Sequence, residues 1–304
     1  MKFDASLGVT PEIGAQVFVG SPRIAIKRST LWFRRSLIGL SFAVVGVALV
    51  MPIIAIFGAA LNHGFGTYLS SILNAETWGA LKLTLLTVAL VLPLNTLFAL
   101  SLAWAINKTR VKGSTWLLIL TDLPLTISPV VSGLMIILLY GQRGWLGTQL
   151  HALGFDVVYS VPAVILGTLF VTVPYVAKQI LPQIEAQGTQ LEEAAATLGA
   201  GGWQIFKRVT LPSIRLSLVQ GVILAAARAA GEFGAVSMVS GHIRGLTTTL
   251  PQHVEILYNE YRFTAAYSVA SILTLFAVLS LAVKAFFASG LEPAPRPNDP
   301  SRRG

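Results

Sequence analysis

Cysteine is absent from the 304 residues, and charged residues make up only 12% of them. A chain without thiols has no disulfide, no thiolate metal site and no cysteine nucleophile. No phosphate-binding loop of the form Gly-x-x-x-x-Gly-Lys-[Ser/Thr] occurs either. The four histidines are far apart and lack metal-ligand spacing: His63, His151, His242 and His253. We therefore predict no catalytic residue, no metal site and no cofactor bound by this chain.

What the chain has in abundance is apolar sequence. Apolar residues make up 54% of it, and the mean hydropathy is +0.71. A membrane-spanning helix needs roughly 20 mostly apolar residues, and about six such stretches occur. The sequence therefore predicts an all-α integral membrane protein whose helices cross the bilayer at about 36–61, 80–106, 114–140, 161–181, 214–240 and 263–288. Prolines inside these stretches are tolerable because neighbouring helices can satisfy the freed carbonyls.

The net charge of +9 could suggest a nucleic-acid partner, but the basic residues form no continuous stripe. They gather in the terminal segments and in alternate linkers, while the other linkers carry only Arg143, Arg244 and Arg262. Because basic residues favour the inner side of a membrane, we expect both termini in the cytoplasm. The organisation predicted is a cytoplasmic segment (1–35), a transmembrane domain (36–288) and a disordered polar tail (289–304).

A motif with fixed spacing lies in the linker at about 185–213, which the charge pattern places in the cytoplasm. The residues are Glu193-Ala194-Ala195, then Gly199, and then Val209-x-Leu211-Pro212. Residues 192–198 favour a short helix, Gly199 suits a left-handed closing position, and Pro212 suits the first turn of another helix. An ordinary hairpin joining two spans is the alternative.

This spacing resembles the EAA loop of ABC-importer permeases, with valine at 209 where that family more often has isoleucine. The resemblance implies the MetI-like fold of type I importers. It also implies that the loop is a coupling helix that docks on a separate cytoplasmic ATPase, and that ATP and magnesium are used by this partner. One six-helix chain would form half of a translocation pathway.

A charged pair lies in the fifth predicted span, where Arg228 and Glu232 interrupt apolar sequence. Charges inside a membrane usually face a protein interior or a watery cavity. We expect Arg228 to attract an anion and Glu232 to restrain Arg228. Gly231 and Gly234 would loosen the backbone and expose N–H groups, and Phe233 would be either a gate or a packing residue. The alternative is a purely structural pair that neutralises itself.

Residues 227–235, Ala-Arg-Ala-Ala-Gly-Glu-Phe-Gly-Ala, resemble a motif of the permeases for sulfate, thiosulfate, molybdate and tungstate. Together with Ser-Pro-Val-Val-Ser-Gly at 128–133, they look most like the CysW-type sulfate permease subunits. The resemblance implies a bacterial inner-membrane importer with two ATPase copies, a companion CysT-type permease in a heterodimer, and an extracytoplasmic sulfate-binding protein. A molybdate or tungstate permease is the alternative, and a self-contained anion channel or secondary carrier is a further one.

One more charged side chain falls inside a predicted span. Asp122 precedes Pro124 in the third span, and we expect it to cap a helix or to lie at a helix break.

Overall fold

A computed structural model describes residues 28–109 and 113–289, and every regular element in these residues is a helix. The chain divides into two compact units, 1–51 and 52–304. The predicted tail and most of the predicted N-terminal segment lie outside the described residues.

The first unit contains helix α1 (Arg28–Val45) and a π turn, η1 (Gly46–Val50). Helix α2 (Met51–Leu61) follows in sequence. Residues Trp32–Leu61 are long enough to cross a membrane, and an 18-residue stretch within them has a mean hydropathy of 2.7. The sequence predicted this span at 36–61, so the span begins four residues earlier than expected, inside a helix that begins at Arg28.

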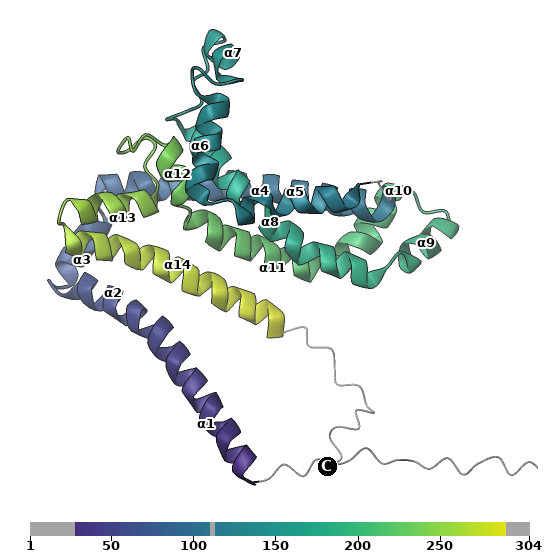
Figure 1. The fold of residues 1–304 in the computed structure, drawn as a ribbon, viewed down its shortest axis with the longest axis horizontal. Coiled ribbons are helices and arrows are strands. Elements are labelled where there is room, and N and C mark those ends of the chain that lie inside the picture. Colours follow the sequence, from purple (N-terminus) through teal and green to yellow (C-terminus); the bar gives the residue numbers. More distant parts are fainter. Residues whose placement is uncertain (1–27, 110–112, 290–304) are drawn as a thin grey trace, which may run out of the picture. The chain divides into compact units, whose positions relative to one another are not determined.

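In the second unit, three long helices pack against one another: α4 (Ala75–Thr109), α8 (Val161–Gln187) and α11 (Leu211–Ala230) (Figure 1). Their shared core holds fully buried Val176, Ile180 and Ile214, among others. A buried hydrogen bond joins two of the helices, since Asn95 Nδ2 donates to Thr172 Oγ1 at 2.7 Å. These three helices form the core of the domain.

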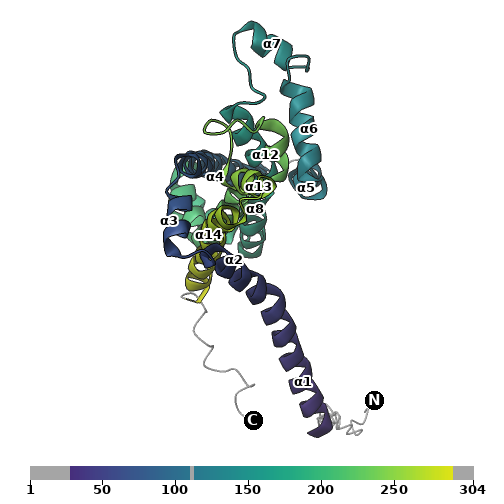
Figure 2. The ribbon, with the colours of Figure 1, turned by 90° about the vertical axis from the view of Figure 1, so that its left-hand side faces the viewer.

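The fourth long helix, α14 (Phe263–Ser289), packs against α11. Two shorter helices, α3 (Phe65–Ile72) and α13 (Leu250–Asn259), pack against α14, and α13 also contacts α4 (Figure 2). Five helices in the described residues are long and apolar enough to cross a membrane, or six if one bent pair counts as a span. The structure thus bears out the predicted membrane fold of about six spans.

The predicted span over 114–140 is a bent pair of helices in the structure. Helix α5 (Ser114–Thr126) ends, and α6 (Pro129–Tyr140) begins at an angle of 109° to it. Ile127 and Ser128 between them are extended. A proline disfavours helical backbone in the residue before it, so Ser128-Pro129 favours this break. Beyond α6 lies the short helix α7 (Gly147–Ala152).

The fifth span is also displaced from its predicted position. The helix starts at Gly202 and continues through α10 (Gly202–Ile205), the π turn η2 (Phe206–Thr210) and α11 to Ala230. A new short helix, α12 (Gly234–Val239), begins after a three-residue break. The helix that contains the predicted span therefore covers 202–230, whereas the span was predicted at 214–240.

Candidate functional site

The motif at 193–212 folds as a short helix followed by a tight turn. Helix α9 (Gln190–Thr197) lies where the sequence predicts it. Gly199 has a φ of +83°, which is the left-handed conformation expected of a residue that closes a helix. Both local predictions are confirmed.

Helix α9 and the turn after it present apolar side chains to the surface. Leu198 is 88% exposed and Trp203 is 73% exposed. Ala194 is exposed beside them, and Ala195 is half-buried. Large apolar side chains gathered on a polar loop are typical of a surface that another protein covers.

Glu193, the first residue of the motif, is exposed and bonded within its own turn. The Thr189 hydroxyl donates a hydrogen bond of 2.6 Å to Glu193 Oε1. Its carboxylate therefore helps to close the first turn of α9 and remains accessible from outside.

Pro212 lies in the first turn of α11, as the sequence predicts, but α11 continues an existing helix and does not start a new one. The proline lies inside the continuous helix 202–230, two residues after the π turn η2. Proline lacks an N–H and its ring crowds the carbonyl four residues back. In the π turn, Leu211 N–H bonds to the Phe206 carbonyl, five residues back. The wider turn adapts the helix to the proline, while Val209 and Leu211 remain half-buried.

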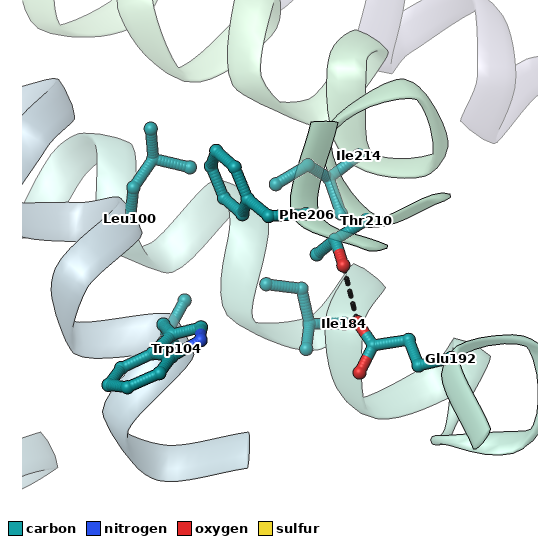
Figure 3. A pocket seen from close by; sticks show the side chains of 8 residues that line it. Leu100, Trp104, Ile184, Glu192, Phe206, Thr210 and Ile214 are labelled. Atoms are coloured by element: carbon teal, nitrogen blue, oxygen red, sulfur yellow. Dashed lines mark hydrogen bonds between the residues drawn. The ribbon is translucent and has the colours of Figure 1, made fainter. Parts of the chain in front are cut away.

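The sequence analysis missed Glu192, which precedes the motif. Its side chain is buried, and the Thr210 hydroxyl donates a hydrogen bond to Glu192 Oε1 (Figure 3). Figure 3 shows this pair beside a small cavity whose other lining residues include Ile184 and Phe206. Two adjacent glutamates thus have opposite environments, because successive residues of a helix face different directions.

The predicted ion pair forms at the far end of α11. Arg228 Nη1 lies 2.6 Å from Glu232 Oε2. The Arg228 side chain is 29% exposed, whereas that of Glu232 is 1% exposed. Glu232 Oε1 also accepts a hydrogen bond of 3.0 Å from the Ala235 N–H, so this carboxylate caps α12 as well as pairing with arginine. The arginine is the member of the pair that a ligand can reach.

The helix breaks between Ala230 and Gly234, as the predicted loosening of the backbone implies, but the N–H of Gly231 is not free. Gly231 has an ordinary φ of −94°, and its N–H bonds to the Ala227 carbonyl. The Glu232 N–H bonds to the Ala229 carbonyl. These two donors are therefore already engaged by the end of α11. Phe233 is 39% exposed and occupies the break before α12.

Gly234 instead permits a close contact between the two breaks. A Cβ on Gly234 would lie 2.8 Å from the Pro129 Cβ. A Cβ on Gly133 of α6 would lie 2.7 Å from the Ala235 carbonyl oxygen. The motifs at 128–133 and 227–235, which are far apart in sequence, therefore pack directly together.

Asp122 neither caps a helix nor lies at the break, which also corrects the prediction. It lies within α5, five residues before the break at Ile127. Asp122 Oδ1 forms an ion pair of 3.1 Å with Lys178 Nζ of α8, and both side chains are half exposed. The pair links α5 to α8.

A second charged cluster joins α13 to the loop before it. Arg244 contacts Glu260 through a charge-assisted hydrogen bond and lies 3.6 Å from Glu76 at the start of α4. This hydrogen bond raises the pKa of Arg244 and lowers the pKa of Glu260. Burial lowers the pKa of His253, whose Nε2 lies 3.2 Å from the Thr77 hydroxyl. The cluster fixes three segments to one another.

Comparison with known proteins assigns the chain to a family. Residues 95–293 match the family described as the binding-protein-dependent transport system inner membrane component. The chain belongs to this family. Within residues 28–109 and 113–289, this permease has no cluster of three metal-ligating side chains.

Curated relatives cover most of the permease. It is 44% identical over 260 residues to the sulfate transport system permease protein CysW of Synechococcus elongatus, covering 86% of this chain and 91% of that protein. The identity to CysW of Escherichia coli strain K12 is 41% over 261 residues, or 86% and 90% of the two chains. The sulfate transport system permease protein CysT of the same strain is 32% identical over 244 residues, covering 80% and 88%.

A solved structure shares the fold. The crystal structure of a bacterial alginate ABC transporter, in complex with an alginate pentasaccharide-bound periplasmic protein, matches with a TM-score of 0.70 at 20% identity. The match covers 86% of this permease and 94% of that chain. The predicted importer-permease fold is confirmed. Within this fold the two predicted sites lie toward opposite ends of the helix 202–230, with the predicted coupling loop at its start and Arg228 at its end.

Proposed function

We propose that this permease is a transmembrane subunit of an ATP-driven importer that carries sulfate, and also thiosulfate, across the inner membrane. The observation that carries the proposal is its identity of 41–44% to CysW proteins over nearly their whole length. The motif at 227–235 supports the same substrate class, since it places an accessible arginine inside the domain.

Energy for this transport must come from another subunit. Sulfate is a dianion at neutral pH, and moving it inward against an inside-negative potential costs about 2.3 kcal/mol for each charge per 100 mV. The sequence contains no phosphate-binding loop. We assign ATP and magnesium to two copies of a separate ATPase, one of which binds the coupling loop at Glu193–Pro212.

The remaining partners follow from the relatives. The chain is similar to both CysW and CysT proteins, which supports a heterodimer with a CysT-type permease. The family description names a binding protein, and we assign an extracytoplasmic sulfate-binding protein to the outer face. The charge pattern supports cytoplasmic termini, so α9 is cytoplasmic and the Arg244 cluster lies outside.

The mechanism uses the helix 202–230 as a rigid connection. Closure of the ATPases displaces α9, and the connected helix carries this displacement toward Arg228. The accessible guanidinium attracts the passing anion, while buried Glu232 holds the arginine in place and weakens its attraction. A weak site suits transport because tight binding would slow release.

Substrate competition tests the proposal. The complete complex is reconstituted in vesicles with ATP, and uptake of radiolabelled sulfate is measured with and without a tenfold excess of unlabelled anion. We expect ATP-dependent sulfate uptake that unlabelled sulfate and thiosulfate suppress and molybdate leaves largely intact. Preferential suppression by molybdate would instead assign the permease to molybdate or tungstate, and uptake without ATP would assign it to a channel or secondary carrier.

A further inference from the structure

We propose that Glu192 is the positioning residue that joins the coupling helix α9 to the transmembrane helix 202–230, through its hydrogen bond with Thr210. The hydrogen bond between Glu192 and Thr210 is called the joint below. The proposal rests on the proposed function, because the joint matters only if α9 receives force from a partner. It assigns a role to a residue outside the motif Glu193–Pro212.

The first support is the environment of the carboxylate. Glu192 is buried on a loop whose neighbouring residues, Leu191 and Glu193, are exposed. Burying a carboxylate is costly unless hydrogen bonds or opposite charges compensate. A leucine or alanine would fill such a position without this cost. The hydrogen bond from Thr210 therefore gives a specific connection at a place where simple packing would have sufficed.

The second support is the position of Thr210. It is the last residue of the π turn η2, and the helix continues from it without interruption to Ala230. π turns widen a helix locally and are frequent at functional sites. A displacement of Glu192 therefore acts on the transmembrane helix at the turn that precedes Pro212.

The third support is the packing around the pair. Two cavities of about 10 Å³ each flank Glu192. One lies toward Trp104 of α4 (Figure 3), and the other lies toward Gly188 at the end of α8. Gln187 Nε2 also donates a hydrogen bond of 3.0 Å to the Ser213 carbonyl. The joint thus lies where α4, α8, α9 and the start of the transmembrane helix meet.

Glu193 does not make this connection. It is exposed, and its hydrogen bond with Thr189 stays within α9. We assign partner contact to Glu193 and the internal connection to Glu192.

The test measures the ratio of oxyanion transported to ATP hydrolysed in the complete reconstituted complex. Two variants remove the joint, Glu192→Ala and Thr210→Val, and Thr210→Ser keeps the hydroxyl. The matched control is Glu185→Gln, which changes an exposed carboxylate near the end of α8. Co-purification of the ATPase is measured for every variant.

We expect Glu192→Ala and Thr210→Val each to lower the ratio about tenfold, as loss of a hydrogen bond to a charged group would. The ATPase should stay bound, and the double variant should be no worse than either single variant. Thr210→Ser and Glu185→Gln should keep the wild-type ratio. Unchanged ratios, additive losses, or losses that follow detachment of the ATPase would overturn the proposal.

The experiment distinguishes a wrong role for Glu192 from a wrong assignment of the transported anion. If the wild-type complex carries molybdate and not sulfate, the ratio is measured with molybdate, and the proposal for Glu192 keeps its test. If the wild-type complex shows no ATP-dependent uptake of any oxyanion, the proposed function fails and the proposal for Glu192 fails with it.

Discussion

Gly234 of α12 packs directly on Pro129 of α6, so that a Cβ atom on the glycine would lie 2.8 Å from the Cβ of the proline. Each residue lies at the start of a helix that follows a break in a longer apolar segment. The two breaks therefore support one another. Arg228 and Glu232 lie next to this contact, because Glu232 caps the helix that Gly234 begins.

Because the two breaks are in close contact, we expect even a small side chain at Gly133 to destabilise the permease. A Cβ there would lie 2.7 Å from the Ala235 carbonyl oxygen and from the Met238 Cβ. We expect Gly133→Ala to lower the stability of the permease by about 1–3 kcal/mol, because overpacking forces the helices apart. Thermal unfolding of the purified complex in detergent measures this.

Gly66→Ala in α3 is the matched control, since no heavy atom lies within 4 Å of its added Cβ. We expect this helical substitution to be neutral or mildly stabilising. Equal midpoints for the two variants would show that α6 and α12 do not pack as described.

The ion pair predicts separable effects on stability and transport. Arg228→Ala should lower sulfate uptake at least about tenfold, but it also leaves the buried Glu232 charge uncompensated, which costs about 3–5 kcal/mol. The double variant Arg228→Ala with Glu232→Gln removes this uncompensated charge. We expect the double variant to regain thermal stability without regaining uptake. Normal uptake by either variant would make the pair purely structural.

Because His253 is buried, we expect the folded permease to lose stability in acid. Burial lowers its folded pKa, so below its ordinary pKa of about 6.5 the unfolded chain binds a proton that the folded chain does not. Stability is then lost as the pH falls from about 6.5 to the folded pKa, and it is retained above 6.5. Thermal midpoints of the purified complex between pH 8 and pH 5 measure this slope.

His253→Gln should flatten the part of the slope that begins near pH 6.5, because glutamine does not titrate. Part of the acid sensitivity should remain at lower pH, since the pKa of Glu260 is lowered by its hydrogen bond with Arg244. An unaltered slope in the variant would show that another group controls the acid response.

The sequence predicted the coupling loop and most spans because each depends on local signals. Helix formers at 192–198, a left-handed glycine and apolar runs act within a few residues. The bend after α5 was missed because prolines do not always break membrane helices: Pro93 and Pro174 lie inside unbroken ones. Whether a proline bends its helix depends on packing partners that hydropathy does not reveal.

The positions of charged residues were also only partly predictable from the sequence. The fifth span was predicted to begin at 214, after the basic pair Lys207 and Arg208, whereas the helix begins before them at Gly202. The sequence also could not distinguish buried Glu192 from exposed Glu193. Glu192 is the one that faces Thr210, which is 18 residues away along the chain.

The coupling role of the loop at 193–212 is the central claim, and Gly199 tests it most directly. A Cβ at Gly199 meets no atom within 4 Å, so only its φ of +83° opposes substitution. Valine there costs roughly 1–2 kcal/mol in backbone strain and should displace the end of α9. Gly201→Ala is the matched control, because Gly201 has an ordinary φ of −70° and also has open space around it.

The deciding measurement is sulfate uptake together with ATP hydrolysis in vesicles that contain the reconstituted Gly199→Val complex. We expect hydrolysis to continue while uptake falls to background, and we expect Gly201→Ala to behave as the wild type does. Unchanged uptake by Gly199→Val would contradict the coupling role of this loop.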